Sequence, residues 1–107
     1  MKLMTKAIER KARRNYTQMG GDLEQMVVAK FFDPCGSWTW YLMNQDPEDP
    51  NYLWGIVDGF AVEIGSFGLD DLMSHKGPMG IGIERDLYFT PIKARDVYKR
   101  LNKGEHI

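Results

Sequence analysis

The sequence contains a single cysteine, Cys35, and only two histidines in 107 residues. A single thiol cannot form a disulfide within one chain. One cysteine and two histidines are also too few ligands for a multi-cysteine or histidine-rich metal site. Long apolar runs are missing as well, since the longest reach about five residues and a membrane-spanning helix needs roughly 20. The composition therefore excludes a disulfide-stapled scaffold, a zinc ribbon and a membrane-spanning protein.

A secretory signal is also not expected. Residues 1–14 are basic, but no apolar stretch follows them, and a signal peptide requires one. A lone cysteine without such a signal favours a reducing compartment. We therefore expect a cytoplasmic protein.

What is present is the composition of one globular domain. Hydrophobic residues make up 43% and charged residues 27% of the chain, which is ordinary for a soluble protein. A chain of this length buries roughly two-thirds of its unfolded surface, so it can hold a core without disulfides. We expect a single domain over residues 1–107.

The net charge of −1 hides a segregation of charge along the chain. Residues 1–14 carry a net charge of +5, residues 22–86 a net charge of −9 and residues 93–105 a net charge of +3. Two interpretations stay open. Basic helices and acidic loops neutralise each other within the fold, or two exposed surfaces carry opposite signs. The first is the more usual outcome for runs of charge.

The sequence predicts a helix over residues 6–18. Thr5 is a good N-cap residue, and Gly20-Gly21 suits the left-handed turn that ends a helix. The apolar positions follow helical spacing and form one narrow stripe, made of Ile8, Ala12, Tyr16 and Met19.

A hairpin is predicted next. β-Branched and aromatic residues favour strands over residues 26–32 and 37–42. The segment Asp33-Pro34-Cys35-Gly36 has the residues of a tight turn at the right positions, so it joins the two strands.

The middle of the chain predicts a loop and a second hairpin. The polar segment 44–51 holds two prolines, which is typical of a loop. Two apolar runs, 52–57 and 60–64, flank Asp58-Gly59. That dipeptide favours a two-residue hairpin turn in which both central residues have positive φ.

The last third predicts two helices and one strand. Ser66 is the expected cap of a short helix over residues 69–74, and residues 87–90 are an expected strand. Thr90 is the expected cap of a last helix that has Pro91 at its first position. The whole order predicts an α+β fold. We expect a mostly antiparallel sheet of four to five strands, with an N-terminal helix, a C-terminal helix and one short helix.

Aromatic rings lie on both faces of the predicted second strand, with Trp38 and Trp40 on one and Tyr41 on the other. Because only one face of the sheet is expected to pack on the terminal helices, the other is expected to expose aromatic side chains. Such a surface beside basic helices can stack single-stranded bases. The residues of this nucleic-acid-binding alternative are Lys6, Arg10, Lys11, Arg13, Arg14, Lys93, Arg95, Lys99, Arg100, Trp38, Trp40 and Tyr41.

No constellation in the sequence indicates catalysis. His75 lacks a nucleophile and an orienting partner at a suitable spacing, and the glycines of residues 77–82 lack the Gly-Lys-Ser/Thr of a phosphate-binding loop. A third class of function, a hydrolase or metal-dependent nuclease, needs the carboxylates of Glu84, Asp86 and Asp58 within a few ångströms of one another. We predict a protein that is not an enzyme and that has no cofactor and no metal site.

Several stretches occur in a specific order and spacing. They are Lys30-Phe31-Phe32-Asp33-Pro34, Ser37-Trp38-Thr39-Trp40-Tyr41, Gly55-Ile56-Val57-Asp58-Gly59, Gly65-Ser66-Phe67 and Ile83-Glu84-Arg85-Asp86-Leu87-Tyr88-Phe89. Together they resemble the bacterial family called domain of unknown function 2958, over nearly the whole chain up to about Pro91. The resemblance implies a small bacterial protein, often in plasmids or integrated mobile elements near genes for DNA maintenance and antirestriction. It carries over no activity.

The acidic middle of the chain favours a protein partner. A small accessory protein of a mobile element, regulatory or anti-defence in type, would use an acidic or aromatic surface to dock a basic protein. The candidate protein-binding residues are Asp46, Glu48, Asp49, Glu84, Arg85 and Asp86. Binding of nucleic acid through the basic helices is the alternative, and no membrane contact is expected.

Overall fold

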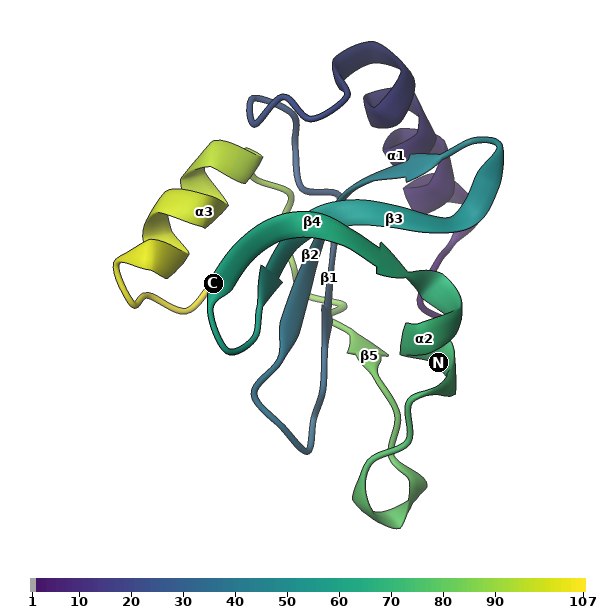
Figure 1. Ribbon diagram of the computed structural model, residues 1–107, viewed down its shortest axis with the longest axis vertical. Helices are drawn as coiled ribbons and strands as arrows, with labels where there is room; N and C mark the ends of the chain where they lie inside the picture. Colours follow the sequence, from purple (N-terminus) through teal and green to yellow (C-terminus); the bar gives the residue numbers. More distant parts are fainter. Residues whose placement is uncertain (1) are drawn as a thin grey trace.

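The computed structural model describes residues 2–107 and holds one five-stranded sheet in which all neighbouring strands run antiparallel (Figure 1). The strand order is β4-β3-β2-β1-β5, so the α+β class and the antiparallel sheet are confirmed. No helix in the described residues is long and apolar enough to cross a membrane. In chain order the elements are α1 (Lys6–Met19), β1 (Ala29–Phe32), β2 (Thr39–Asp46), β3 (Asp49–Asp58), β4 (Val62–Gly68), α2 (Leu69–Ser74), the 3₁₀ turn η1 (Pro78–Gly80), β5 (Glu84–Arg85) and α3 (Ala94–Asn102).

The sheet is covered on both faces. Leu42 belongs to a core that includes Ala12 of α1 and Leu72 of α2. Its neighbour Tyr41 belongs to a second core with Val97 of α3. Because consecutive strand residues point to opposite faces, α1 and α3 lie on opposite sides of the sheet (Figure 1). The expectation that both terminal helices cover one face and leave the other exposed is therefore wrong.

The first predicted elements are confirmed. Thr5 Oγ1 accepts a hydrogen bond from the Ile8 backbone N–H at 3.1 Å and caps α1. Gly20 ends the helix with a φ of 54°, in the region that favours glycine. β1 and β2 form the expected hairpin, and the Gly36 N–H closes its turn on the Asp33 carbonyl oxygen at 3.2 Å.

The loop predicted over residues 44–51 is wrong. β2 continues to Asp46 and β3 begins at Asp49, so the connection is a short turn. Asn44 and Gln45 are buried, at 2% and 0% exposure. Their side-chain amides can be buried because each finds hydrogen-bond partners.

The turn at Asp58-Gly59 differs from the expected type. Neither residue has a positive φ, and β4 begins at Val62, later than predicted. A Cβ on Gly59 would lie 2.5 Å from the Trp38 ring. Glycine is needed here because the Trp38 ring packs against the backbone. The sequence preference for Asp-Gly in hairpin turns does not take such a contact into account.

Three further local predictions near the C-terminus are wrong. The edge strand is β5 at residues 84–85, not 87–90, and α3 begins at Ala94 with Lys93 as a cap that makes no side-chain bond. Ser66 lies within β4, and Asn51 Oδ1 instead accepts from the Asp70 N–H at the start of α2 at 2.7 Å. Groups distant in sequence replaced the local caps, a side chain at α2 and the backbone carbonyl oxygens of Gln25 and Leu23 at α3.

A glycine pair in the sheet gives a direct test of this packing. Gly55 and Gly65 face each other across β3 and β4. A Cβ on Gly55 would overlap the Tyr41 carbonyl oxygen, whereas one on Gly65 meets nothing within 4 Å. We expect Gly55→Ala to lower the free energy of unfolding by about 2–3 kcal/mol in urea titrations. The control Gly65→Ala is expected to be neutral or slightly stabilising. Equal effects would contradict the close approach at Gly55.

Candidate functional site

The turn between β2 and β3 carries three of the predicted protein-binding carboxylates, which we call the acidic hairpin: Asp46, Glu48 and Asp49. Asp46 Oδ1 accepts from the Glu48 N–H at 2.8 Å, and Asp49 Oδ1 accepts from the Asn51 N–H at 3.2 Å. These local bonds fix the turn while the other carboxylate oxygens stay on the surface.

Contacts from α1 hold the acidic hairpin beside that helix (Figure 1). The Tyr16 hydroxyl donates to Asp46 Oδ2 at 3.3 Å, and Arg13 Nε donates to Gln45 Oε1 at 3.0 Å. The pKa of Tyr16 is raised, chiefly by the negative charge of Asp46 and then by partial burial. A negative charge therefore lies beside the Tyr16 hydroxyl.

A network of amide side chains, the amide network, joins the end of α1 to β2. Asn44 Nδ2 donates to the Gly20 carbonyl oxygen at 2.7 Å and to Gln25 Oε1 at 3.1 Å. Gln25 Nε2 donates to the same Gly20 oxygen at 2.7 Å. Asn15 Nδ2 donates to the Met43 carbonyl oxygen at 3.0 Å. These bonds satisfy buried polar atoms and fix the chain that follows α1 against the sheet.

Next to this network is a pocket of about 340 Å³, which we call the aromatic pocket. Its lining residues are Tyr16, Gly20, Gly21, Asn44, Tyr52 and Trp54. Tyr52 and Trp54 are two positions apart on β3, so they point to the same face. Tyr16 comes from α1, at 37% exposure, and Tyr52 is 38% exposed. The pocket is therefore open to solvent and has rings from two elements.

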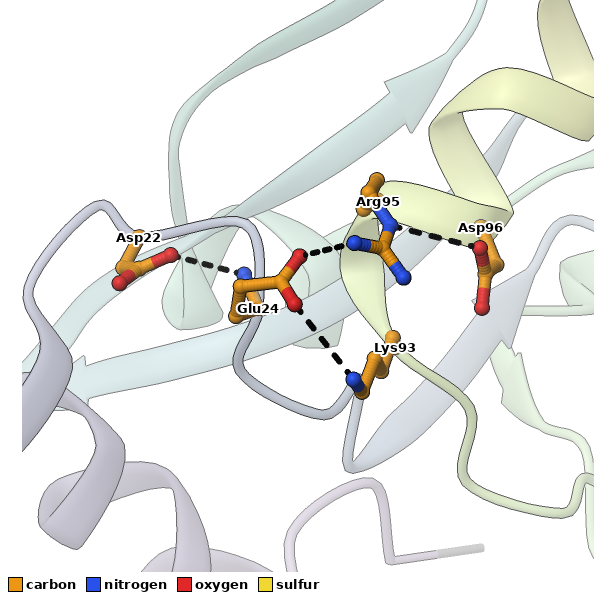
Figure 2. A network of polar contacts seen from close by, with 5 residues as sticks. All are labelled: Asp22, Glu24, Lys93, Arg95 and Asp96. Atoms are coloured by element: carbon orange, nitrogen blue, oxygen red, sulfur yellow. Dashed lines mark hydrogen bonds and ion pairs between the residues drawn. The ribbon is translucent and has the colours of Figure 1, made fainter.

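The carboxylates of the acidic hairpin have no ion-pair partner within residues 2–107. About half of the other acids in the described part of the chain make ion pairs. Glu24 contacts Arg95 at 2.8 Å and Lys93 at 3.4 Å, and its backbone N–H donates to Asp22 (Figure 2). The charge segregation is thus partly structural, and the acidic hairpin is a place where three acids close together in the sequence have no ion pair.

The predicted nucleic-acid-binding residues do not form one continuous patch, because α1 and α3 lie on opposite faces. Four of these bases make ion pairs, with Glu9, Glu24, Asp96 and Glu105: Arg13, Lys93, Arg95 and Arg100. Five are exposed and make no ion pair in the described part of the chain: Lys6, Arg10, Lys11, Arg14 and Lys99.

The aromatic residues of that alternative are mostly covered. Tyr41 is only 2% exposed. Trp40 packs against the core on the α1 side. Trp38 is partly exposed and meets Phe60 edge to face, with ring centroids 5.2 Å apart. Of these three rings, Trp38 and Trp40 are half-buried and Tyr41 is buried, so none is fully exposed for stacking.

The other predicted protein-binding residues lie elsewhere and act within the fold. Glu84 pairs with Phe32 at the edge of the sheet. Arg85 Nη1 donates to the Leu3 carbonyl oxygen at 3.4 Å, and Asp86 Oδ2 lies 3.6 Å from Lys30 Nζ. β5 is level with the start of β2, so roughly 20 Å of strand separates it from the acidic hairpin. The structure does not bring the two groups together.

Among the residues that the structure describes, no group of three or more His, Cys, Asp or Glu side chains is arranged to hold a metal ion. Glu84, Asp86 and Asp58 therefore do not meet the geometric requirement set for a metal-dependent hydrolase. His75 Nε2 lies 3.4 Å from Asp33 Oδ2, in a contact between two surface turns. Cys35 is exposed in the same turn as Asp33.

A larger pocket of about 660 Å³ lies between the N-terminal segment, α2 and the segment before β5. Apolar side chains including Leu69 and Ile83 form its walls, and charges of both signs line it: Lys2, Glu9, Lys76 and Glu84. Because the two positive and two negative side chains balance, the pocket has no net charge that would favour an anionic or a cationic ligand. The aromatic pocket and the acidic hairpin are therefore the better candidate site.

A family model described as "Protein of unknown function (DUF2958)" matches residues 3–105. The chain belongs to the DUF2958 family. No curated protein and no solved structure matches this DUF2958 chain. The family assignment confirms the resemblance found in the sequence, and it brings no activity with it.

Sequence analysis of this DUF2958 protein missed the aromatic pocket. It placed Tyr16 on the apolar stripe of the first helix, and it ended β2 before Asn44. The spacing of Tyr52 and Trp54 in β3 was the available signal, since it puts both rings on one face. Their meeting with Tyr16 depends on the amide network, which no sequence pattern indicates.

Tyr41 gives a test of burial in this DUF2958 chain. Burial, followed by the charges of Asp58 and Asp86, raises the pKa of Tyr41 to about 12, compared with about 10 in an unfolded chain. Between these values the unfolded state binds fewer protons, so stability falls as the pH rises. From pH 10 to 12 we expect the wild type to lose up to about 2 kcal/mol more than Tyr41→Phe in urea titrations. Parallel pH profiles would contradict this.

Proposed function

We propose that this protein acts without catalysis, as a small accessory protein of bacterial mobile elements that docks a basic protein partner. The docking surface is the acidic hairpin together with the rings beside it. A regulatory or anti-defence role fits such a protein, because charge complementarity alone can direct it to a basic surface of a larger machine.

One observation carries this proposal. The acidic hairpin keeps three carboxylates together at the end of two strands, and within residues 2–107 no basic side chain neutralises them. Glu48 and Asp49 are exposed. The hydrogen bonds within the turn fix its shape. They do not require that the carboxylates lack a basic partner. Such a group of like charges attracts cationic partners and speeds their association.

Nucleic-acid binding has weaker support. The bases of the terminal helices are divided between two faces of the sheet, and four of them make ion pairs. A phosphate backbone is bound best by many cations on one surface. The exposed bases of α1 are the part of the molecule on which this alternative depends.

The test compares two variants of equal net charge. Asp46→Asn, Glu48→Gln and Asp49→Asn together remove the charge of the acidic hairpin and keep side-chain shape. Fluorescence anisotropy would follow binding of a labelled, lysine-rich peptide at low and moderate salt. We expect the triple variant to lose about tenfold in affinity at low salt, and less at moderate salt, because screening weakens exposed charges.

The matched control neutralises three exposed acids away from the hairpin that also make no ion pair in the described residues, through Glu63→Gln, Asp70→Asn and Asp71→Asn. It is expected to bind the peptide within twofold of the wild type. Equal losses in both variants would contradict the proposed surface. Tight, salt-dependent binding of labelled single-stranded DNA, duplex DNA or RNA, with no binding of the peptide, would favour the alternative.

A further inference from the structure

The aromatic pocket lies directly beside the acidic hairpin. Asp46 receives the hydrogen bond of Tyr16, which lines the pocket, and Tyr52 lies three residues after Asp49 on the same strand. The two features therefore form one continuous surface. Its charges lie at the rim, and its rings form the walls.

The walls have the chemistry of a cation site. The faces of Trp and Tyr rings carry negative electrostatic potential and attract ammonium groups, with Trp the strongest. The aromatic pocket has one Trp and two Tyr, namely Trp54, Tyr16 and Tyr52. A volume of about 340 Å³ is enough for the end of one long aliphatic side chain and its terminal group.

Two other features at the pocket carry the same negative sign, and the cation nearest to them is already paired. The Asp46 carboxylate lies 3.3 Å from the Tyr16 hydroxyl, and its negative charge is the largest cause of the raised pKa of Tyr16. The C-terminal end of α1 reaches the pocket at Gly20, whose carbonyl oxygen accepts from Asn44 and Gln25, and the last turn of that helix holds no basic residue. A helix C-terminus favours cations. The guanidinium of Arg13 is engaged by Glu9 and Gln45.

We propose that the aromatic pocket holds the ammonium group of a lysine side chain from the basic partner, with its methylene stem against the rings. This inference rests on the proposed function and names the group that the partner inserts. An anionic group is disfavoured by the rim, and a neutral apolar side chain gains nothing from the carboxylates. An alkylammonium group is attracted by both the aromatic rings and the carboxylates of the rim.

The first test identifies the ligand chemistry with three labelled peptides that differ at one position: lysine, trimethyllysine and norleucine. We expect the lysine and trimethyllysine peptides to shift the indole N–H resonance of Trp54 and the side-chain amide resonances of Asn44 in NMR spectra. The norleucine peptide has the same stem without charge, and we expect it to bind at least about fivefold more weakly. Equal binding of the norleucine peptide would overturn the proposal.

The second test removes one ring. Tyr52 is partly exposed, so Tyr52→Leu is expected to fold, which its thermal midpoint checks. We expect this variant to bind the lysine peptide about fivefold more weakly, and the matched Tyr52→Phe to bind within twofold of the wild type. Trp54→Phe removes a buried indole N–H that has no acceptor in the described residues. It is expected to fold and to weaken binding in the same direction.

The outcomes separate this inference from the proposed function. If neutralising the acidic hairpin weakens binding while Tyr52→Leu leaves it unchanged and the Trp54 resonance does not shift, the pocket proposal fails and the proposed function stands. If the lysine peptide does not bind the wild type even at low salt, both fail. Loss of binding in both sets of variants supports both.

Discussion

The amide network is the constraint on which the candidate site depends. Asn44 lies in a central strand, where an unpaired amide would cost free energy, and its two bonds reach Gly20 and Gln25. Those bonds fix the end of α1 over the sheet. Tyr16 and the Gly20-Gly21 turn then lie where Tyr52 and Trp54 emerge from β3. A buried polar cluster thus determines the position of an exposed aromatic one.

The two faces of the sheet pack against different helices. One face packs on α1 and α2 and the other on α3, so the terminal helices supply both cores. Much of the charge on α3 and on the segment before β1 is used in mutual ion pairs (Figure 2). The acidic hairpin is at the end of the sheet, beyond these pairs. The carboxylates there accept hydrogen bonds within the fold, but no basic side chain of the described residues pairs with them.

The sequence predicts the elements whose causes are local. Thr5, the Asp33-Gly36 turn and the end of α1 at Gly20 each depend on residues within one or two turns of chain, and each prediction is confirmed. The errors share another cause. Residues 44–51 were predicted as a loop because a polar, proline-containing segment gives no sign that distant amides will pair with it. The candidate site was not predicted for the same reason, because its rings come together only when β2 and β3 extend through this segment.

The order of the strands has a consequence for how the chain folds. β1 to β4 pair with their neighbours in sequence, so each closes a short loop, whereas β5 and the C-terminal tail return over long separations. Lys30 bonds to the Ile107 carbonyl oxygen, 77 residues away, and Arg85 to that of Leu3, 82 residues away. Because short loops close at lower entropic cost, the central hairpins are expected to form first. The two ends of the chain then complete the fold, and hydrogen exchange should be slowest in β2 and β3.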